Sequence, residues 1–252
     1  MNFINKLDTP RRIDLRTSFM TPFQGVSLLL SRPSLLFKVF LCSLGIMLSM
    51  PLFVVGFVTI PVFLCMAMLM IINEITGPEH SLSELLSLAY VNMKTKVKAF
   101  IIISFLPLLL SLHILYGLSH NPGSMIVYEI FAVLCFFIVW GIVTANCMLI
   151  CFKKNQTVLN SVYESINLVM SQPFMIFGQL LAWIMGLMFV AAVLFSYILL
   201  LPQVGIQHGT LLETVAVLLI TFLAISAYIT FYTSGVTALL YHWYGNEYET
   251  GE

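Results

Sequence analysis

Long apolar segments dominate this sequence and limit what the chain can fold into. The clearest are residues 99–117, 125–150, 174–200 and 211–240. Each is long enough to cross a bilayer once, because a helix of about 20 residues spans roughly 30 Å of hydrocarbon. The chain is 60% hydrophobic and 9% charged, with a mean hydropathy of +1.01, whereas a soluble domain carries roughly 25% charged residues. We therefore expect an all-α polytopic membrane protein.

A fifth apolar segment, residues 33–72, is too long for one crossing. As a continuous helix its roughly 40 residues would extend about 60 Å. Pro51 lies near its middle, where a proline favours a helix break and a turn. We interpret the segment as a hairpin of two short spans, which gives six spans in total. One span with a re-entrant piece is the alternative.

The basic residues support six spans. With the N-terminus in the cytoplasm, six crossings place every lysine and arginine at or near the inner face, as the positive-inside rule requires. These residues are Lys6, Arg11, Arg12, Arg16, Arg32, Lys38, Lys94, Lys96, Lys98, Lys153 and Lys154. We predict a single integral inner-membrane domain over residues 1–252, with both termini cytoplasmic and a basic tail at 1–18. Because the net charge is zero, composition gives no support to a nucleic-acid partner.

The chain also resembles itself in three units, near residues 19–72, 81–151 and 157–243. Pro33 and Pro173 begin equivalent apolar segments, and each follows a shorter stretch with helical apolar periodicity. Ser81 and Glu84 have the spacing of a capping box, which predicts a helix start. We expect three repeats, each an interfacial amphipathic helix followed by a transmembrane hairpin. Parallel repeats of this kind differ from the inverted repeats of many transporters.

This pattern resembles a group of bacterial six-span inner-membrane proteins that includes the membrane-anchor domain of some glycerophosphodiester phosphodiesterases. The segments that carry the resemblance are 25–37, 81–99 and 158–177. The resemblance implies a six-span fold and supplies no active residues.

No hydrolase, zinc-protease or nucleotide-binding motif occurs in the sequence. We therefore predict no enzyme activity, no cofactor and no metal. The candidate polar site consists of intramembrane or near-membrane residues of the kind that can mark a transport path, or that can join helices: Glu129, Glu213, Asn146, Gln179, Ser226 and Thr230. Small residues spaced four apart, at Gly178, Ala182 and Gly186 and at Gly141 and Ala145, predict close helix packing.

Our leading hypothesis is a non-enzymatic protein that organises lipid or a partner protein at the cytoplasmic face. Anionic headgroups are the expected ligands, and a partner protein or a second copy of the chain is a further expectation. The expected lipid contacts are Arg11, Arg12, Arg16, Lys94, Lys96, Lys98, Lys153 and Lys154. The alternative is a small-solute or ion transporter or channel that uses the outer carboxylates Glu129 and Glu213.

Overall fold

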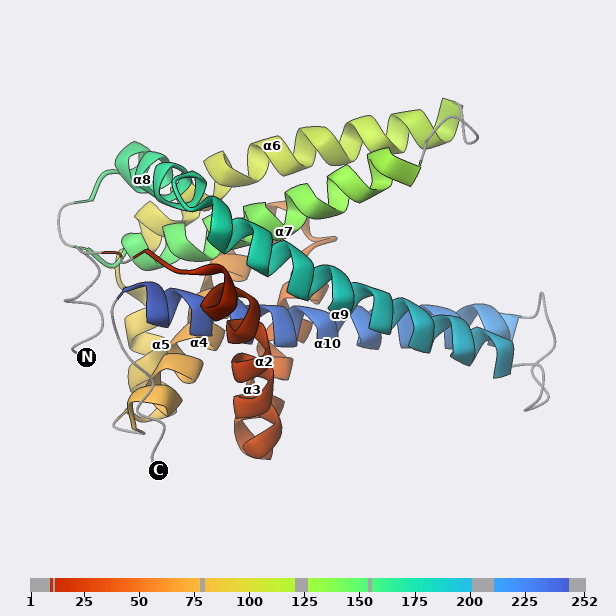
Figure 1. Cartoon of the computed structure of the whole chain (residues 1–252), viewed down its shortest axis with the longest axis horizontal. Helices are drawn as coiled ribbons and strands as arrows, with labels where there is room; N and C mark the ends of the chain where they lie inside the picture. Colours follow the sequence, from red (N-terminus) through yellow and green to blue (C-terminus); the bar gives the residue numbers. More distant parts are fainter. Residues whose placement is uncertain are drawn as a thin grey trace.

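The structure is a computed structural model that describes residues 10, 12–77, 80–120, 127–153, 156–200 and 211–244. The regular elements within these ranges are all helices (Figure 1), as the sequence predicts. In chain order they are α2 (Leu15–Ser31), α3 (Pro33–Ser49), α4 (Phe53–Thr76), α5 (Leu82–Tyr90), α6 (Met93–His120), α7 (Val127–Ile150), α8 (Val158–Met170), α9 (Pro173–Leu200) and α10 (Leu211–Trp243).

Five helices are long and apolar enough to cross a membrane. The crossing segments are Val55–Thr76, Met93–His113, Ala132–Ile150, Pro173–Ala192 and Glu213–Trp243. The pair α2 and α3 passes the same test only together, and the two helices meet at a bend of 112°. The described chain therefore has five candidate spans, or six if the bent pair is one span.

Three times along the chain a helix of at most 17 residues precedes a pair of helices: α2 precedes α3 and α4, α5 precedes α6 and α7, and α8 precedes α9 and α10. The predicted boundaries are present. Pro33 and Pro173 occupy the first helical positions of α3 and α9, where a missing N–H costs no hydrogen bond. The chain turns at residues 50–52, which include Pro51.

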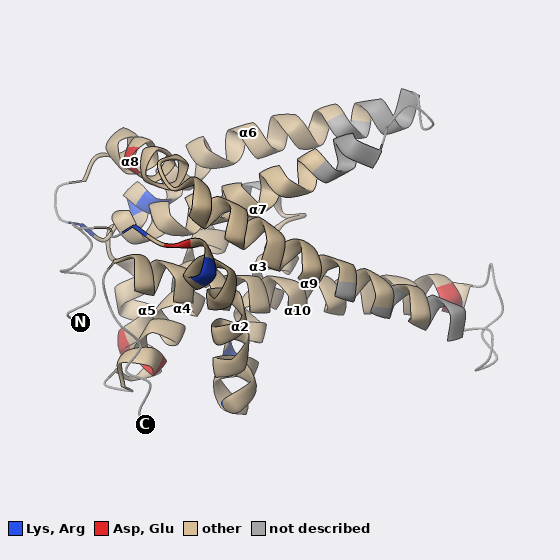
Figure 2. Ribbon diagram, viewed as in Figure 1, with Lys and Arg blue, Asp and Glu red and all other residues tan. Residues whose placement is uncertain are grey.

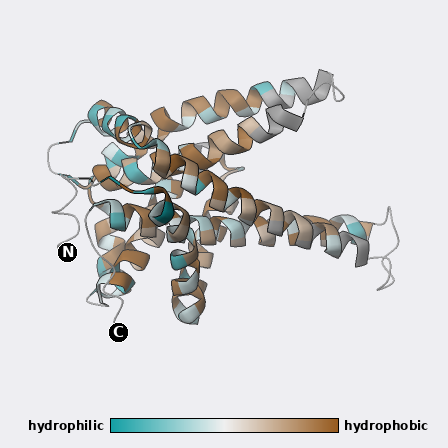
Figure 3. Cartoon of the chain, in the orientation of Figure 1, coloured by the Kyte–Doolittle hydropathy of each residue, from teal (hydrophilic) through white to brown (hydrophobic). Residues whose placement is uncertain are grey.

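The helix pairs are close together at one end of the molecule and diverge at the other. Figure 1 shows α6 and α7 leaning away from α9 and α10. Buried apolar side chains concentrate at the end of α4 (residues 65–72), of α7 (142–150) and of α10 (236–243). The diverging segments stay apolar but exposed (Figure 3), with Phe105 on α6 and Leu218 on α10 among the most exposed. Such a surface suits hydrocarbon rather than water.

Helix α2 runs across α9 and α10 with little separation. The backbone at Gly25 lies so close to α10 that a Cβ there would be 2.7 Å from the Ser234 carbonyl carbon and 2.8 Å from the Gly235 Cα. The Ser234 hydroxyl donates to the Gly25 carbonyl at 2.7 Å. On the other side, the Ser18 hydroxyl donates to the Met175 carbonyl of α9 at 2.6 Å. These contacts fix α2 against the last helix pair.

Candidate functional site

Most charged residues of the described chain lie at the end of the molecule where the helices converge (Figure 2). We call this the basic end, after Arg12, Arg16, Lys94, Lys98 and Lys153. It contains the start of α2, the helices α5 and α8, the start of α6 and the end of α7. At the opposite end Figure 2 shows an acidic position in the first turn of α10, which holds Glu213.

Helix α8 at the basic end has three distinct faces. Its buried face includes the hydroxyls of Ser161 and Ser165, and Ser165 donates to the Val143 carbonyl of α7 at 2.7 Å. An apolar stripe faces outward instead, and within it Leu159 is 68% exposed and Tyr163 is 73% exposed. A soluble amphipathic helix buries its large apolar residues and exposes its polar ones. This helix therefore faces an apolar environment on its outer side.

The third face of α8 is polar and exposed. At 100° per residue, the order around the helix is the buried face, the exposed apolar stripe and then the exposed polar positions Asn160 and Asn167. A helix at a membrane surface meets these three environments in that way: protein on one side, hydrocarbon below and headgroups or water above.

Helices α2 and α5 repeat this three-faced arrangement in the same rotational order. The exposed apolar stripes are Leu15, Phe23 and Leu30 on α2, Leu82, Leu86 and Tyr90 on α5, and Leu159, Tyr163 and Met170 on α8. The buried positions are Ser18, Thr21, Pro22, Gly25 and Leu29 on α2, and Leu85 and Ala89 on α5. The exposed polar positions include Arg16, Gln24 and Ser27 on α2, where the exposed Met20 shares the same face, and Ser83 and Ser87 on α5. The sequence predicted one apolar face per helix, and the structure divides it into a protein-facing part and an outward part.

Four of the expected lipid-contacting cations are exposed at the basic end. Arg12 and Arg16 flank the start of α2, while Lys94 and Lys98 lie one turn apart on α6, just after α5. Within the described residues none of the four forms an ion pair with a carboxylate. Their charges are therefore available to an anionic ligand.

Lys96 differs from our expectation. It is fully buried, its Nζ donates to the Ala89 carbonyl at 2.9 Å, and it lies 3.5 Å from the centre of the Phe152 ring. Ala89 is in the last turn of α5, where a cation satisfies an otherwise unpaired carbonyl and the helix dipole. Sequence spacing alone grouped Lys96 with Lys94 and Lys98, but its position on the helix directs it inward. It therefore joins α5 to α6 and cannot contact a headgroup.

Lys153 also has a protein partner. Its Nζ lies 2.7 Å from Glu164 Oε1, and Gln156 donates to the other oxygen of Glu164 at 3.0 Å. The ion pair connects the segment that follows α7 to α8, and the Lys153 side chain is largely shielded from solvent. The remaining expected contacts, Arg11 and Lys154, lie outside the described residues.

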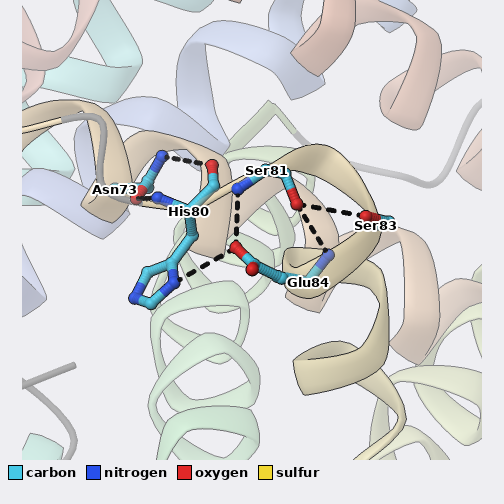
Figure 4. Close-up of polar contacts among 5 residues, drawn as sticks. All are labelled: Asn73, His80, Ser81, Ser83 and Glu84. Atoms are coloured by element: carbon cyan, nitrogen blue, oxygen red, sulfur yellow. Dashed lines mark hydrogen bonds and ion pairs between the residues drawn. The ribbon is translucent and has the colours of Figure 1, made fainter.

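The junction between α4 and α5 fixes the direction of the second short helix (Figure 4). The Asn73 side chain accepts from the His80 N–H at 3.2 Å and donates to the His80 carbonyl at 3.3 Å. The predicted capping box is confirmed: Glu84 accepts from the Ser81 N–H at 2.8 Å, and the Glu84 N–H reaches the Ser81 hydroxyl at 3.4 Å. His80 Nδ1 lies 3.5 Å from Glu84 Oε2.

Hydrogen bonding at this cap affects the ionisation of Glu84. The Ser81 N–H, followed by the Ser81 hydroxyl, holds the pKa of the Glu84 carboxyl below its usual value. The parts played by Asn73 and His80 were not apparent from the sequence, because these residues are separated by a turn and no motif links them.

The candidate polar-site residues are not gathered into one site. Gln179 on α9 donates to the Ser18 carbonyl at 2.6 Å and to the Thr21 hydroxyl at 2.9 Å, and accepts from the Trp183 indole at 2.9 Å. Gln179 therefore links α9 to α2 through interhelical hydrogen bonds. Thr21 and Ser18, which complete this network, were not among the predicted residues.

The hydroxyl face of α10 is likewise committed to packing. Ser226 donates to the Phe222 carbonyl at 2.8 Å, and Thr230 donates to the Ser43 hydroxyl of α3 at 2.9 Å. Asn146, near the end of α7, accepts from the Tyr244 hydroxyl at 2.7 Å.

The two carboxylates that we expect at the outer side lie far from these residues. Glu129 is in the first turn of α7, 17 positions or about 25 Å from Asn146 along the helix axis. Figure 1 shows the starts of α7 and α10, the latter with Glu213, at the tips of separate helix pairs. The side chain of Glu129 is outside the described part. Glu129 and Glu213 are therefore separated from each other, and Glu129 is separated from Asn146, whereas a shared transport path needs these residues close together.

No family model matches the sequence, and no curated protein or solved structure matches the chain.

Proposed function

We propose that this chain is a non-enzymatic polytopic inner-membrane protein that engages anionic lipid at the cytoplasmic face. In this proposal α2, α5 and α8 lie in the inner interface, both termini are cytoplasmic and the basic end is the cytoplasmic end. The six-span arrangement in three repeats, similar to the phosphodiesterase anchor domain, belongs to the same proposal.

The observation that carries it is the three-faced arrangement shared by α2, α5 and α8. A helix with an exposed apolar stripe beside an exposed polar face is stable where hydrocarbon and water meet. The cations Arg12, Arg16, Lys94 and Lys98 are exposed at the same end and are not paired with carboxylates in the described residues. Each cation near an anionic surface contributes about 1 kcal/mol. Together, the stripes and the cations suit a leaflet that contains anionic lipid.

The test compares lipid enrichment around purified protein in nanodiscs that contain phosphatidylglycerol and phosphatidylcholine. In the wild type we expect phosphatidylglycerol to be enriched among the lipids that co-purify after detergent exchange. Lys94→Gln with Lys98→Gln should lower that enrichment roughly thirtyfold, because two contributions of about 1 kcal/mol are removed. The matched control, Lys94→Arg with Lys98→Arg, keeps the charge and should keep the enrichment. Equal enrichment in all three proteins contradicts the proposal.

Topology is tested separately by reporter fusions after Pro51, Asn121 and Gln207. The proposal expects a periplasmic signal at each of these sites, and a cytoplasmic signal at any of them contradicts the six-span arrangement.

A further inference from the structure

An apolar cavity of about 390 Å³ lies between α3 and α10. Its volume falls within the range of small-ligand pockets, about 300–1,000 Å³. Four residues of α3 that recur at helical spacing form one wall: Pro33, Leu36, Phe37 and Phe40. The facing wall comes from α10, through Ala227, Thr230 and Phe231.

The lining of the cavity is almost entirely apolar. The Thr230 hydroxyl is its one polar side-chain group, and this hydroxyl donates to Ser43, which in turn donates to the Val39 carbonyl at 3.1 Å. A buried water needs two to four polar partners, so water is a poor occupant. Left empty, the walls would lose the dispersion contacts that a packed interior makes. The lining therefore favours an apolar occupant over water or a polar ligand.

The position of the cavity indicates where that occupant comes from. Residues 227–231 lie near the middle of the candidate span Glu213–Trp243. Phe37, on the cavity wall, is 62% exposed, and α3 continues with the exposed side chains of Leu41 and Leu48. The cavity is thus continuous with the apolar outer surface of α3. Within a bilayer this surface faces acyl chains.

The residue that precedes the α3 wall of the cavity is a cation. Arg32 directly precedes Pro33, is about half exposed and pairs with Glu74 of α4. A guanidinium has five N–H donors, so the pairing leaves donors for a phosphate. Phe40 lies seven residues after Pro33 on α3, about 10 Å further along the helix axis. The cavity therefore has a polar end and an apolar depth, the arrangement that an amphiphile fits.

We propose that one acyl chain of a membrane phospholipid occupies the α3–α10 cavity, with its phosphate toward Arg32. This inference deepens the proposed lipid function and rests on it only in that the ligand is a bilayer lipid. It adds a specific binding site, independent of headgroup charge.

The test uses the full chain in nanodiscs of neutral phosphatidylcholine that carries a photoreactive diazirine on one acyl chain. After exchange with excess unlabelled lipid and photolysis, adducts are mapped by peptide mass spectrometry. We expect persistent adducts in residues 33–40 and 227–231. The exposed side chains of Met185 and Met188 on α9 are the reference for freely exchanging lipid. Adduct yields at the cavity no higher than at this reference would overturn the proposal.

Two substitutions define the site. Ala227→Phe places a ring inside the cavity and should lower both cavity adducts to the reference yield, whereas Ala191→Phe, at an exposed position of α9, should leave them unchanged. Unchanged cavity adducts in Ala227→Phe contradict the proposal.

Because Ala227→Phe could disturb folding, Phe40→Leu provides a second variant. It widens the cavity, and its adducts should be retained, so their loss also contradicts the proposal. Neutral lipid keeps this result separate from the headgroup test. Cavity adducts without anionic enrichment leave this inference standing and remove the proposed function, and the reverse result removes only the inference.

Discussion

The contact between α2 and α10 allows the sharpest stability prediction. In Gly25→Ala the new Cβ would lie 2.7 Å from the Ser234 carbonyl carbon and oxygen and 2.8 Å from the Gly235 Cα. All three are backbone atoms, so relief requires the two helices to separate. Overpacking of this kind costs about 1–3 kcal/mol, and the lost Ser234–Gly25 hydrogen bond adds about 1 kcal/mol.

Alanine also favours a helix over glycine by about 1 kcal/mol, so the net loss of unfolding free energy is about 1–3 kcal/mol. Gly186→Ala in α9 is the matched control, because the nearest atoms to its added Cβ are 3.9 Å away. We expect it to be neutral or to stabilise by up to about 1 kcal/mol. The assay is reversible unfolding in mixed micelles by sodium dodecyl sulfate titration. Equal unfolding free energies for the two variants would refute the close α2–α10 packing.

Three further predictions concern single side chains. Gln179→Leu removes hydrogen bonds to Ser18, Thr21 and Trp183 and should destabilise the protein by about 2–3 kcal/mol in the same titration; no loss of stability contradicts its role as a link between helices. Lys96→Ala leaves the Ala89 carbonyl unpaired and opens a cavity, so it should destabilise the protein by about 2–4 kcal/mol. Lys98→Ala, at an exposed position, is the control, and an equally small effect of both substitutions contradicts the burial of Lys96. Because hydrogen bonds lower the pKa of Glu84, its contribution to the α5 cap is present above the ordinary glutamate pKa and lost as the pH falls through the lower folded value. Hydrogen-exchange protection factors of the α5 amides, which are corrected for the pH dependence of intrinsic exchange, should therefore fall on acidification in the wild type but not in Glu84→Gln. Identical pH profiles of these protection factors contradict the assignment.

Sequence patterns predicted the features of this fold that depend on local chemistry. Proline at the first turn of α3 and α9, and the Ser81–Glu84 cap of α5, follow from backbone hydrogen bonding within a few residues. Apolar length predicted the candidate spans, except that α3 passes the span test only together with α2.

Long-range contacts were harder to predict. Gly178 and Gly141 do pack closely, against Ser18 and Tyr232, but a Cβ at Gly186, at the same spacing, would make only ordinary van der Waals contact with Trp183 at 3.9 Å. The spacing of small residues identifies a helix face that can pack closely, but not the helix that packs against it. Nothing in the sequence therefore indicated that Gly25 contacts α10. Lys96 was wrongly assigned to the lipid surface for the same reason, since its inward direction depends on where α5 and Phe152 lie. Nothing local distinguishes it from the exposed Lys98.

The central claim is that α2, α5 and α8 lie at a boundary between hydrocarbon and water, and α8 tests it most directly. Single spin labels are placed along α8, in a background with the five native cysteines replaced, and their collisions with oxygen and with a water-soluble nickel chelate are measured by electron paramagnetic resonance in liposomes. The account predicts oxygen access at positions 159, 163 and 170, nickel access at 160 and 167, and protection from both at 161, 165 and 169. Nickel access at 159, 163 and 170 equal to that at 160 and 167 would contradict it.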